Sequence, residues 1–406
     1  MVRSIQYVDV APLKLLHYDD TVKSPLFISL RWARSLDTSF LAKAVARPAM
    51  LVSLVAFVAC ARTSVNAAPA TERTPHGVDV TLVTDEVDAA LSIIRSAASG
   101  EMPTARQWSA LFESQGYNHL KEREASMDRA FTDSSFAQFL TSDSVAARLP
   151  AIARVVPELE RIDVTSAARM ALAYLPVGTP IRARLYLEIK PHTNSFVFTG
   201  RDSVPSIFIY VKTDETAAQL NNTLAHELHH IGTNAACRNA PSADSTHTTP
   251  AERMLLEYLT AFGEGRAMLA AAGGPDVHPH ATDADSIRAR WDRDVAHAPA
   301  DIADLSEFIT DVIAGRIATA DSVKRRGNSY FGVQGAWYTV GWLMASTVER
   351  EAGRDALIGT LCNPVGFLSQ YNHAARRSNS MEHTTLPLWP APLIDTLSKM
   401  ARPAGT

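Results

Sequence analysis

Apolar side chains recur at helical spacing over most of the chain beyond residue 84. In the first such segment, residues 84–98, Val87, Leu91 and Ile94 fall on one stripe, and residues three to four apart share one face of an amphipathic helix. The same spacing returns in residues 108–117, 131–140, 164–174, 287–295, 302–317 and 336–349. The chain is therefore predicted to be mostly helical.

The pattern changes to that of strands between residues 181 and 211. Residues 182–189, RARLYLEI, alternate or run apolar, and residues 195–199 and 206–211 are rich in β-branched and aromatic side chains, as strands are. We expect an α+β, mostly helical fold in which a small sheet directly precedes the next helix.

That next helix, predicted for residues 214–232, separates an apolar face from a polar one. At about 100° per residue, His226 and His230 lie roughly 160° to 200° around the helix from Leu224, so they face away from its core side. Asp214 is the expected N-cap and Gly232 the expected residue just past the end. The apolar stripe consists of Ala217, Leu220, Leu224, Leu228 and Ile231.

Residues 226–230 of this helix read H-E-x-x-H. Histidines four apart stand above one another on one helix face, so both rings can reach one metal ion, with Glu227 beside it as a general base. The alternative is a chance match on a helix that only exposes its histidines. His229 is less suited as a ligand, because a third histidine in such a turn is more often solvated or bonded to a ligand. The pattern predicts zinc bound by His226 and His230.

A catalytic zinc site needs a third protein ligand and an open position for water. Two common downstream arrangements are absent. The first requires glycine at 233 and histidine at 236, where the chain has Thr233 and Ala236. The second, G-T-x-x-D, begins with Gly232 and Thr233 but has Ala236 in place of the aspartate. A second helix is predicted for residues 250–272, with an N-terminal Thr-Pro pair and a terminal Gly-Gly pair. Its glutamates are the remaining candidates.

Three glutamates of this second helix differ in how well they suit the metal. Gly263 and Gly265 flank Glu264, and each glycine costs about 1 kcal/mol in a helix interior, so we expect another part of the chain to pack very closely there. Glu264 is the preferred third ligand. Glu257, seven residues earlier, is the alternative or an acceptor for a ligand histidine, and Glu252 is the least suited.

At this point the chain resembles the gluzincin-type metallopeptidases, and more narrowly zinc-dependent peptidases in bacterial families of unknown function. The shared motifs are A-H-E-L-H-H-I at 225–231, E-G-R-A at 264–267 and Y-T-V-G at 338–341. In those families two histidines and a glutamate bind zinc and the glutamate of H-E-x-x-H is catalytic. The resemblance implies these roles for His226, His230, Glu264 and Glu227, and a zincin-like catalytic core.

The resemblance also suggests how a substrate is held. In gluzincin-like folds a strand such as residues 206–211 can bind an extended peptide by strand addition, although a core strand is the alternative. Tyr338, in the Y-T-V-G motif, is a candidate to stabilise the oxyanion. A tyrosine that only packs in the core is the alternative.

Residues 50–59, MLVSLVAFVA, form an uncharged apolar run of ten residues. This is too short for a bilayer core of about 30 Å but suits a signal peptide, with a buried core helix as the alternative. We predict a signal peptide at 50–67, preceded by an extension of doubtful origin at 1–49. Cleavage after Ala67 and lipidation of Cys60 both fit, so the protein is expected to be periplasmic, extracellular or lipid-anchored.

Composition narrows the partners and the domain plan. A net charge of −4 and a pI of about 6.4 give no electrostatic case for nucleic acid. The length of 406 residues suits one large or two modest domains. We predict an N-terminal helical region at 68–150 and the zincin-like catalytic region at 151–400, with Pro150 and Pro157 at the boundary.

The remaining cysteines and histidines carry weaker predictions. Cys237 and Cys362 would form a disulfide between the loop after the zinc helix and the C-terminal helices, or stay two buried thiols. His278, His280 and His297 lie among proline, aspartate and alanine and are expected to be solvated.

The leading hypothesis is an exported zinc-dependent metallopeptidase acting on a peptide or protein, with membrane contact only through its signal peptide or a lipid anchor at Cys60. One alternative is a secreted helical binding or scaffold protein with structural zinc or none. Another is a zinc hydrolase of a non-peptide amide or ester. Glu227 separates the first two, because a structural site needs no acid beside the ion.

Overall fold

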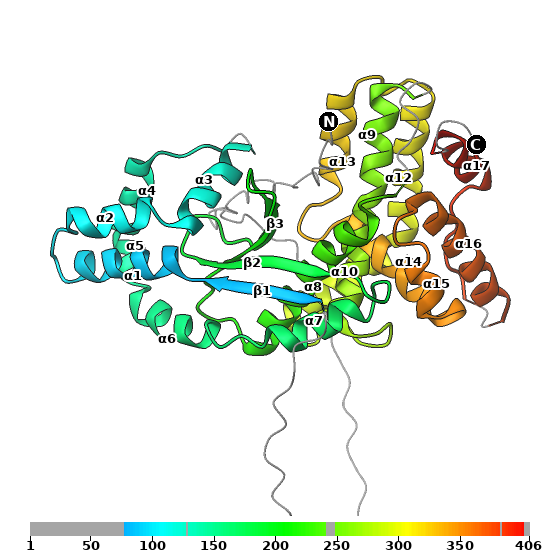
Figure 1. Ribbon diagram of the computed structural model, residues 1–406. Coiled ribbons are helices and arrows are strands. Elements are labelled where there is room, and N and C mark those ends of the chain that lie inside the picture. Colours follow the sequence, from blue (N-terminus) through cyan, green and yellow to red (C-terminus); the bar gives the residue numbers. More distant parts are fainter. Residues whose placement is uncertain (1–76, 127–128, 241–247, 382–383, 402–406) are drawn as a thin grey trace, which may run out of the picture. The chain divides into compact units, whose positions relative to one another are not determined.

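The computed structural model describes residues 77–126, 129–240, 248–381 and 384–401 (Figure 1). The predicted extension 1–49, the signal peptide 50–67 and Cys60 lie outside these residues. The fold is α+β and mostly helical with one small sheet, as predicted. Among the helices described, none combines the length and the apolar character needed to cross a membrane.

The elements follow one another in the order strand, seven helices, three strands and a helical remainder. The strands are β1 (Val78–Val83), β2 (Ile181–Glu188), β3 (Phe196–Thr199) and β4 (Pro205–Tyr210). The helices before β2 are α1 (Asp85–Ala98), α2 (Ala105–Phe112), α3 (Gln115–Ser126), α4 (Asp133–Leu140), α5 (Asp143–Ala146), α6 (Leu149–Leu159) and α7 (Val164–Leu172). Those after β4 are α8 (Ala217–Cys237), α9 (Pro250–Leu259), the 3-10 helix η1 (Thr260–Phe262), α10 (Gly263–Ala272), α11 (Asp285–Ala296), α12 (Ala298–Ile313), α13 (Ala320–Ser329), α14 (Ala336–Ala352), α15 (Arg354–Ile358), α16 (Pro364–Met381) and α17 (Ala391–Met400).

The sheet has the strand order β1-β2-β4-β3. β1, β2 and β4 are parallel and β3 is antiparallel to β4, with Leu185 of β2 opposite Ile207 of β4. Because β4 is paired on both sides, the expectation that residues 206–211 bind an extended peptide is wrong, and the core-strand alternative holds. β1 was not predicted, because its sequence VDVTLV is short and runs straight into a strongly amphipathic helix.

The buried apolar side chains form two cores. The first joins the sheet to α1, α6, α7 and the apolar face of α8. The second surrounds α14, whose Trp337, Val340 and Met344 are fully buried among α9, α12 and α16. α10 contributes Ala271 to the first core and Leu269 to the second, so this helix is packed from both sides.

Two predicted breaks are helical in the structure. Pro150 and Pro157 both lie in α6. Proline is tolerated in the first turn of a helix, and Pro157 falls near the last one. The polar, glycine-containing stretch 325–332 is typical of a turn, but its first five residues form the end of α13. A Cβ on Gly327 would come within 2.5 Å of the Tyr258 ring, so this glycine permits close packing instead of a turn.

The two cysteines outside the predicted signal peptide form a disulfide, Cys237–Cys362, as expected. Cys237 is the last residue of α8 and not part of a following loop. The bond therefore ties the C-terminal end of the helix that bears the zinc motif to the segment between α15 and α16.

Removing this disulfide is expected to lower the stability of the protein markedly. The bond closes a loop spanning 125 residues, and long closed loops restrict the unfolded chain the most. The double variant Cys237→Ser/Cys362→Ser should lose about 2–5 kcal/mol of unfolding free energy, measured by urea denaturation. The wild type treated with reductant should match the variant, and unchanged midpoints in both would contradict the assigned bond.

Candidate metal centre

The helix that carries H-E-x-x-H is longer than predicted at its C-terminal end. α8 begins after Thr216, whose hydroxyl accepts from the backbone N–H of Gln219 in a capping box, so the prediction of Asp214 as N-cap is wrong. The helix continues past Gly232 to Cys237. A Cβ on Gly232 would lie 2.2 Å from Leu175 Cδ1, so this glycine makes room for the end of α7 and does not stop the helix.

The two faces of α8 are arranged as predicted. Leu220, Leu224, Leu228 and Ile231 are at most 4% exposed, while Ala217 at the helix start is exposed. The His226 and His230 side chains, on the other face, are 13% and 10% exposed. The histidines are thus held by a buried helix and still reach the protein surface.

The predicted second helix is divided in two. α9 ends at Leu259, one 3-10 turn follows, and α10 begins at Gly263 and ends before Gly273, whose φ of 86° gives a left-handed cap. Glu252 is used as a cap, because its carboxylate accepts from the backbone N–H of Thr249 at 2.7 Å. Glu257 is exposed on α9, and Glu264 lies in the first turn of α10.

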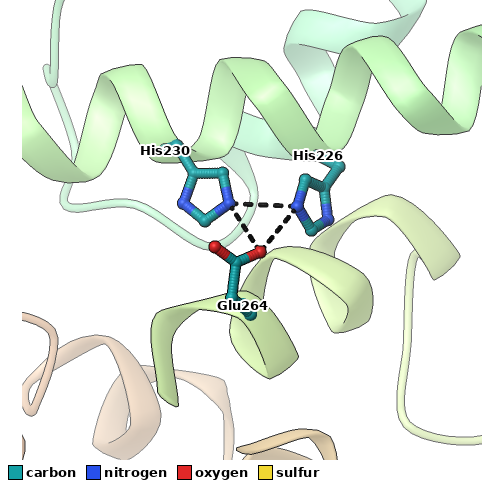
Figure 2. A group of neighbouring side chains, drawn as sticks. All are labelled: His226, His230 and Glu264. Atoms are coloured by element: carbon teal, nitrogen blue, oxygen red, sulfur yellow. Dashed lines mark hydrogen bonds and ion pairs between the residues drawn. The ribbon is translucent and has the colours of Figure 1, made fainter. Parts of the chain in front are cut away.

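His226, His230 and Glu264 converge on one point (Figure 2). The Nε2 atoms of the two histidines are 3.0 Å apart. Glu264 Oε2 lies 3.1 Å from His226 Nε2 and 3.2 Å from His230 Nε2. Among the described residues this is the one group of three or more histidine, cysteine or acidic side chains close enough to hold a metal ion.

This donor set fits zinc. Two imidazole nitrogens and one carboxylate oxygen are ligands that zinc accepts, and bonds of about 2.0–2.1 Å at tetrahedral angles put ligand atoms roughly 3.3–3.4 Å apart. The three separations in the structure are close to that value. With three protein donors, a tetrahedral ion would keep one position for water, which is the arrangement of catalytic rather than structural zinc.

His230 and Glu264 shift each other's pKa. Burial would lower the pKa of His230, but the carboxylates of Glu264 and Glu227 outweigh it and raise that pKa. Burial would likewise raise the pKa of Glu264, but His230 and His226 hold it well below its ordinary value. Glu264 is therefore ionised at neutral pH, as a metal ligand must be.

The third histidine of the motif region faces elsewhere. His229 is 2% exposed, and its ring is hydrogen-bonded to the backbone of Tyr174. Burial holds its pKa well below the ordinary value, so the ring is neutral. His229 is thus a packed core histidine beside α7, consistent with its expected exclusion from the ligands.

Glu227 and Tyr338 flank the three converging side chains. Glu227 follows His226 on α8, is half-buried, and is close enough for its charge to raise the pKa of His230. The Tyr338 ring, on α14, is half-buried and stacks on the His226 ring at 6.4 Å between centroids with an interplanar angle of 14°. Both residues predicted to be catalytic therefore lie beside the metal group, as we call His226, His230 and Glu264 together.

The tight packing expected beside Glu264 is present at Gly265, where the close neighbour is α14. A Cβ on Gly265 would lie 2.0 Å from the Trp342 backbone nitrogen and 2.2 Å from the Gly341 carbonyl carbon. A Cβ on Gly341 would in turn lie 2.7 Å from Phe262 O. α10 thus crosses α14 at two facing glycines, and it also packs against α8. This crossing brings the helix that carries Glu264 against the helix that carries Tyr338.

Adding one methyl group at this crossing should be severely destabilising. Gly265→Ala forces Cβ against the backbone of α14, and the neighbouring backbone cannot move aside cheaply, so we expect a loss of about 3 kcal/mol or more in unfolding free energy. Gly274→Ala is the matched control, because a Cβ there meets nothing within 4 Å. Thermal and urea unfolding that show equal losses for both variants would contradict the crossing.

One histidine predicted to be solvated is instead part of the packing around α8. His280 is 6% exposed, bonds through Nδ1 to Asp283 Oδ2 at 2.6 Å, and meets the Trp291 ring edge-on at 5.1 Å. Asp283 Oδ1 accepts from Gln219 Nε2 at 2.7 Å, which anchors the start of α8. The His-x-x-Asp spacing was the available signal, but the surrounding Pro and Ala suggested a loop.

A family model described as "Putative zinc dependent peptidase (DUF5700)" matches residues 95–380. The match covers more than half of the chain and includes α8, α10 and α14. No curated protein and no solved structure matches the chain.

Proposed function

The chain belongs to the DUF5700 family, and from that premise we propose that it is a zinc-dependent metallopeptidase of the gluzincin type that hydrolyses peptide bonds. The observation that carries the proposal is the convergence of His226, His230 and Glu264 within 3.0–3.2 Å of one another. Glu227 beside them supports catalysis over a purely structural role, since a structural site has no use for an acid beside the ion.

His226 and His230 from α8 and Glu264 from α10 would hold the ion. Bound zinc supplies a Lewis acid that activates water and polarises a carbonyl. Glu227 takes the proton of the attacking water and later delivers it to the leaving amine. The carboxylate and amine of the products then separate without a covalent intermediate on the protein.

Tyr338 is proposed to donate its hydroxyl hydrogen to the oxygen that gains charge in the transition state. Its stacking on the His226 ring supports this role. For the substrate backbone we propose the free edge of β3, because β3 is an edge strand and contacts α8. An extended peptide there would pair through main-chain hydrogen bonds.

Export is also part of the proposal. The apolar run at 50–59 suits a signal peptide, with cleavage after Ala67 or lipidation at Cys60. The Cys237–Cys362 disulfide supports a compartment outside the reducing cytosol. We therefore propose a periplasmic, extracellular or lipid-anchored peptidase.

A peptide-library assay tests the activity. The purified zinc-loaded protein should cleave a set of library peptides, and an excess of a strong zinc chelator should abolish cleavage, because the ion is removed from its three ligands. Added zinc should restore the activity, whereas added magnesium, which prefers oxygen ligands, should not. Cleavage that persists in chelator would contradict a zinc-dependent mechanism.

A further inference from the structure

A cavity of about 160 Å³ lies among α3, α4 and the segment that follows β2. Its lining is mostly apolar and includes Leu120, Phe131 and Phe136, of which the two phenylalanine rings stack at 5.3 Å between centroids. A cavity of about 150 Å³ lined by such residues can hold benzene. This one therefore has room for one phenyl or branched alkyl group.

Two hydrogen-bonding groups in the lining have capacity to spare. Arg129 donates from Nε and Nη2 to the two oxygens of Glu124, at 2.8 and 3.2 Å, and its Nη1 donates to nothing within the described residues. His192, also in the lining, is an exposed residue, and its ring has no hydrogen-bond partner in the described part of the chain either. Partial burial lowers the pKa of this ring, and a neutral imidazole still offers one N–H.

The fixed charges around the cavity favour an anion. Glu124 is the ionised carboxylate of the group, held at a lowered pKa by Arg123 and Arg129 against its burial, and both its oxygens are already bonded to these arginines. Lys190, also in the lining, donates only to neutral oxygens, from the His192 carbonyl and from Asn194. Among the described residues that line the cavity, two cations, Arg129 and Lys190, therefore stand beside one ionised acid, Glu124.

Two further acids near the cavity do not cancel this positive charge. Glu86 and Glu188 are 1% and 0% exposed. Burial raises the pKa of Glu86 to about 8 and that of Glu188 well above its ordinary value, so burial disfavours the charged form of both. Excess positive charge held in a region of low dielectric constant attracts an anionic ligand strongly.

We propose that this cavity, the Arg129 pocket, binds a small carboxylate that carries one apolar group. The apolar group would lie against Phe131 and Phe136, and the carboxylate would accept from Arg129 Nη1 and the His192 N–H. Such a ligand is either a free apolar carboxylic acid or the C-terminal residue of a peptide. The pocket shares no element with the metal group, so it is a second site that does not depend on the proposed peptidase activity.

Titration with 3-phenylpropanoate, followed by ligand-observed NMR on the purified full chain, tests the pocket. We expect saturable binding at millimolar concentrations or below, at least about tenfold tighter than that of the neutral 3-phenylpropan-1-ol, because a charge-assisted hydrogen bond is lost with the alcohol. Chelator should leave binding unchanged. Equal affinity for acid and alcohol, or no saturation by either, would overturn the proposal.

Variants locate the binding. Arg129→Gln should weaken 3-phenylpropanoate by at least about tenfold, while Arg182→Gln, whose side chain is 81% exposed on β2, should have no effect. Because Arg129→Gln also removes a partner of buried Glu124, its thermal unfolding must be recorded. His192→Ala leaves that ion pair intact and should weaken the acid but not the alcohol. Unchanged affinity in His192→Ala and in folded Arg129→Gln would refute the site.

A last pair of probes separates the two sources of ligand. Acetyl-Gly-Phe with a free carboxylate and its C-terminal amide are titrated in chelator, which prevents hydrolysis. Binding of the free peptide but not of the amide would support recognition of peptide C-termini. Binding of 3-phenylpropanoate alone would support free acids as the ligand, and equal binding of peptide and amide would overturn the carboxylate contact.

Discussion

Glu264→Ala is expected to abolish tight zinc binding. The variant leaves two imidazoles facing the ion, and it removes the carboxylate that lies 3.1 and 3.2 Å from both of them. Losing a residue that only supports a ligand costs about 10- to 100-fold in metal affinity, and losing a ligand should cost more. Competition with a chromophoric chelator measures the change.

Glu257→Ala is the control for this prediction. Glu257 lies seven residues before Glu264, but the 3-10 turn at Thr260–Phe262 separates the two helices that carry them, and Glu257 is exposed. Its removal should leave zinc affinity near that of the wild type. The reverse result, with zinc lost in Glu257→Ala and kept in Glu264→Ala, would move the ligand to α9 and refute the site described here.

Glu227→Gln should separate binding from catalysis. The amide has the size of the acid but cannot accept the proton of water, so peptide cleavage should fall by at least about 100-fold, the usual contribution of a general base. Zinc affinity should stay near normal, because the three ligand side chains are unchanged. Library cleavage and zinc titration on the same preparation measure both quantities.

Glu307→Gln is a matched control, since Glu307 is exposed on α12, away from the metal group. It should keep full activity. If Glu227→Gln retained the activity of Glu307→Gln, the acid beside the metal would have no catalytic role, and the alternative of a secreted binding protein with structural zinc would be favoured.

The metal group could be predicted because its determinants are local. The spacing of His226 and His230, and the apolar stripe opposite them, are properties of one helix, and both hold in the structure. The residue at which that helix ends is not determined by its own sequence. Gly232 was predicted to stop α8, but it is needed where Leu175 packs, and no pattern within residues 214–237 reveals that neighbour.

Partners distant in sequence account for the other differences. β1 pairs with β2 across about a hundred residues, and parallel pairing of this kind leaves no mark on either strand alone. Gly265 beside Glu264 correctly indicated close packing, but the sequence could not tell that Gly341 of α14 was the neighbour. The Arg129 pocket likewise joins three segments that sequence does not connect.

Elemental analysis of the purified protein, grown in zinc-replete medium, tests the central claim most directly. Two imidazoles and an ionised carboxylate converging within 3.2 Å should retain about one zinc per chain through purification, as three-ligand zinc sites do. Glu264→Ala prepared in parallel should retain almost none. A wild-type protein free of zinc, or one whose zinc content is unchanged in Glu264→Ala, would contradict the proposed metal centre.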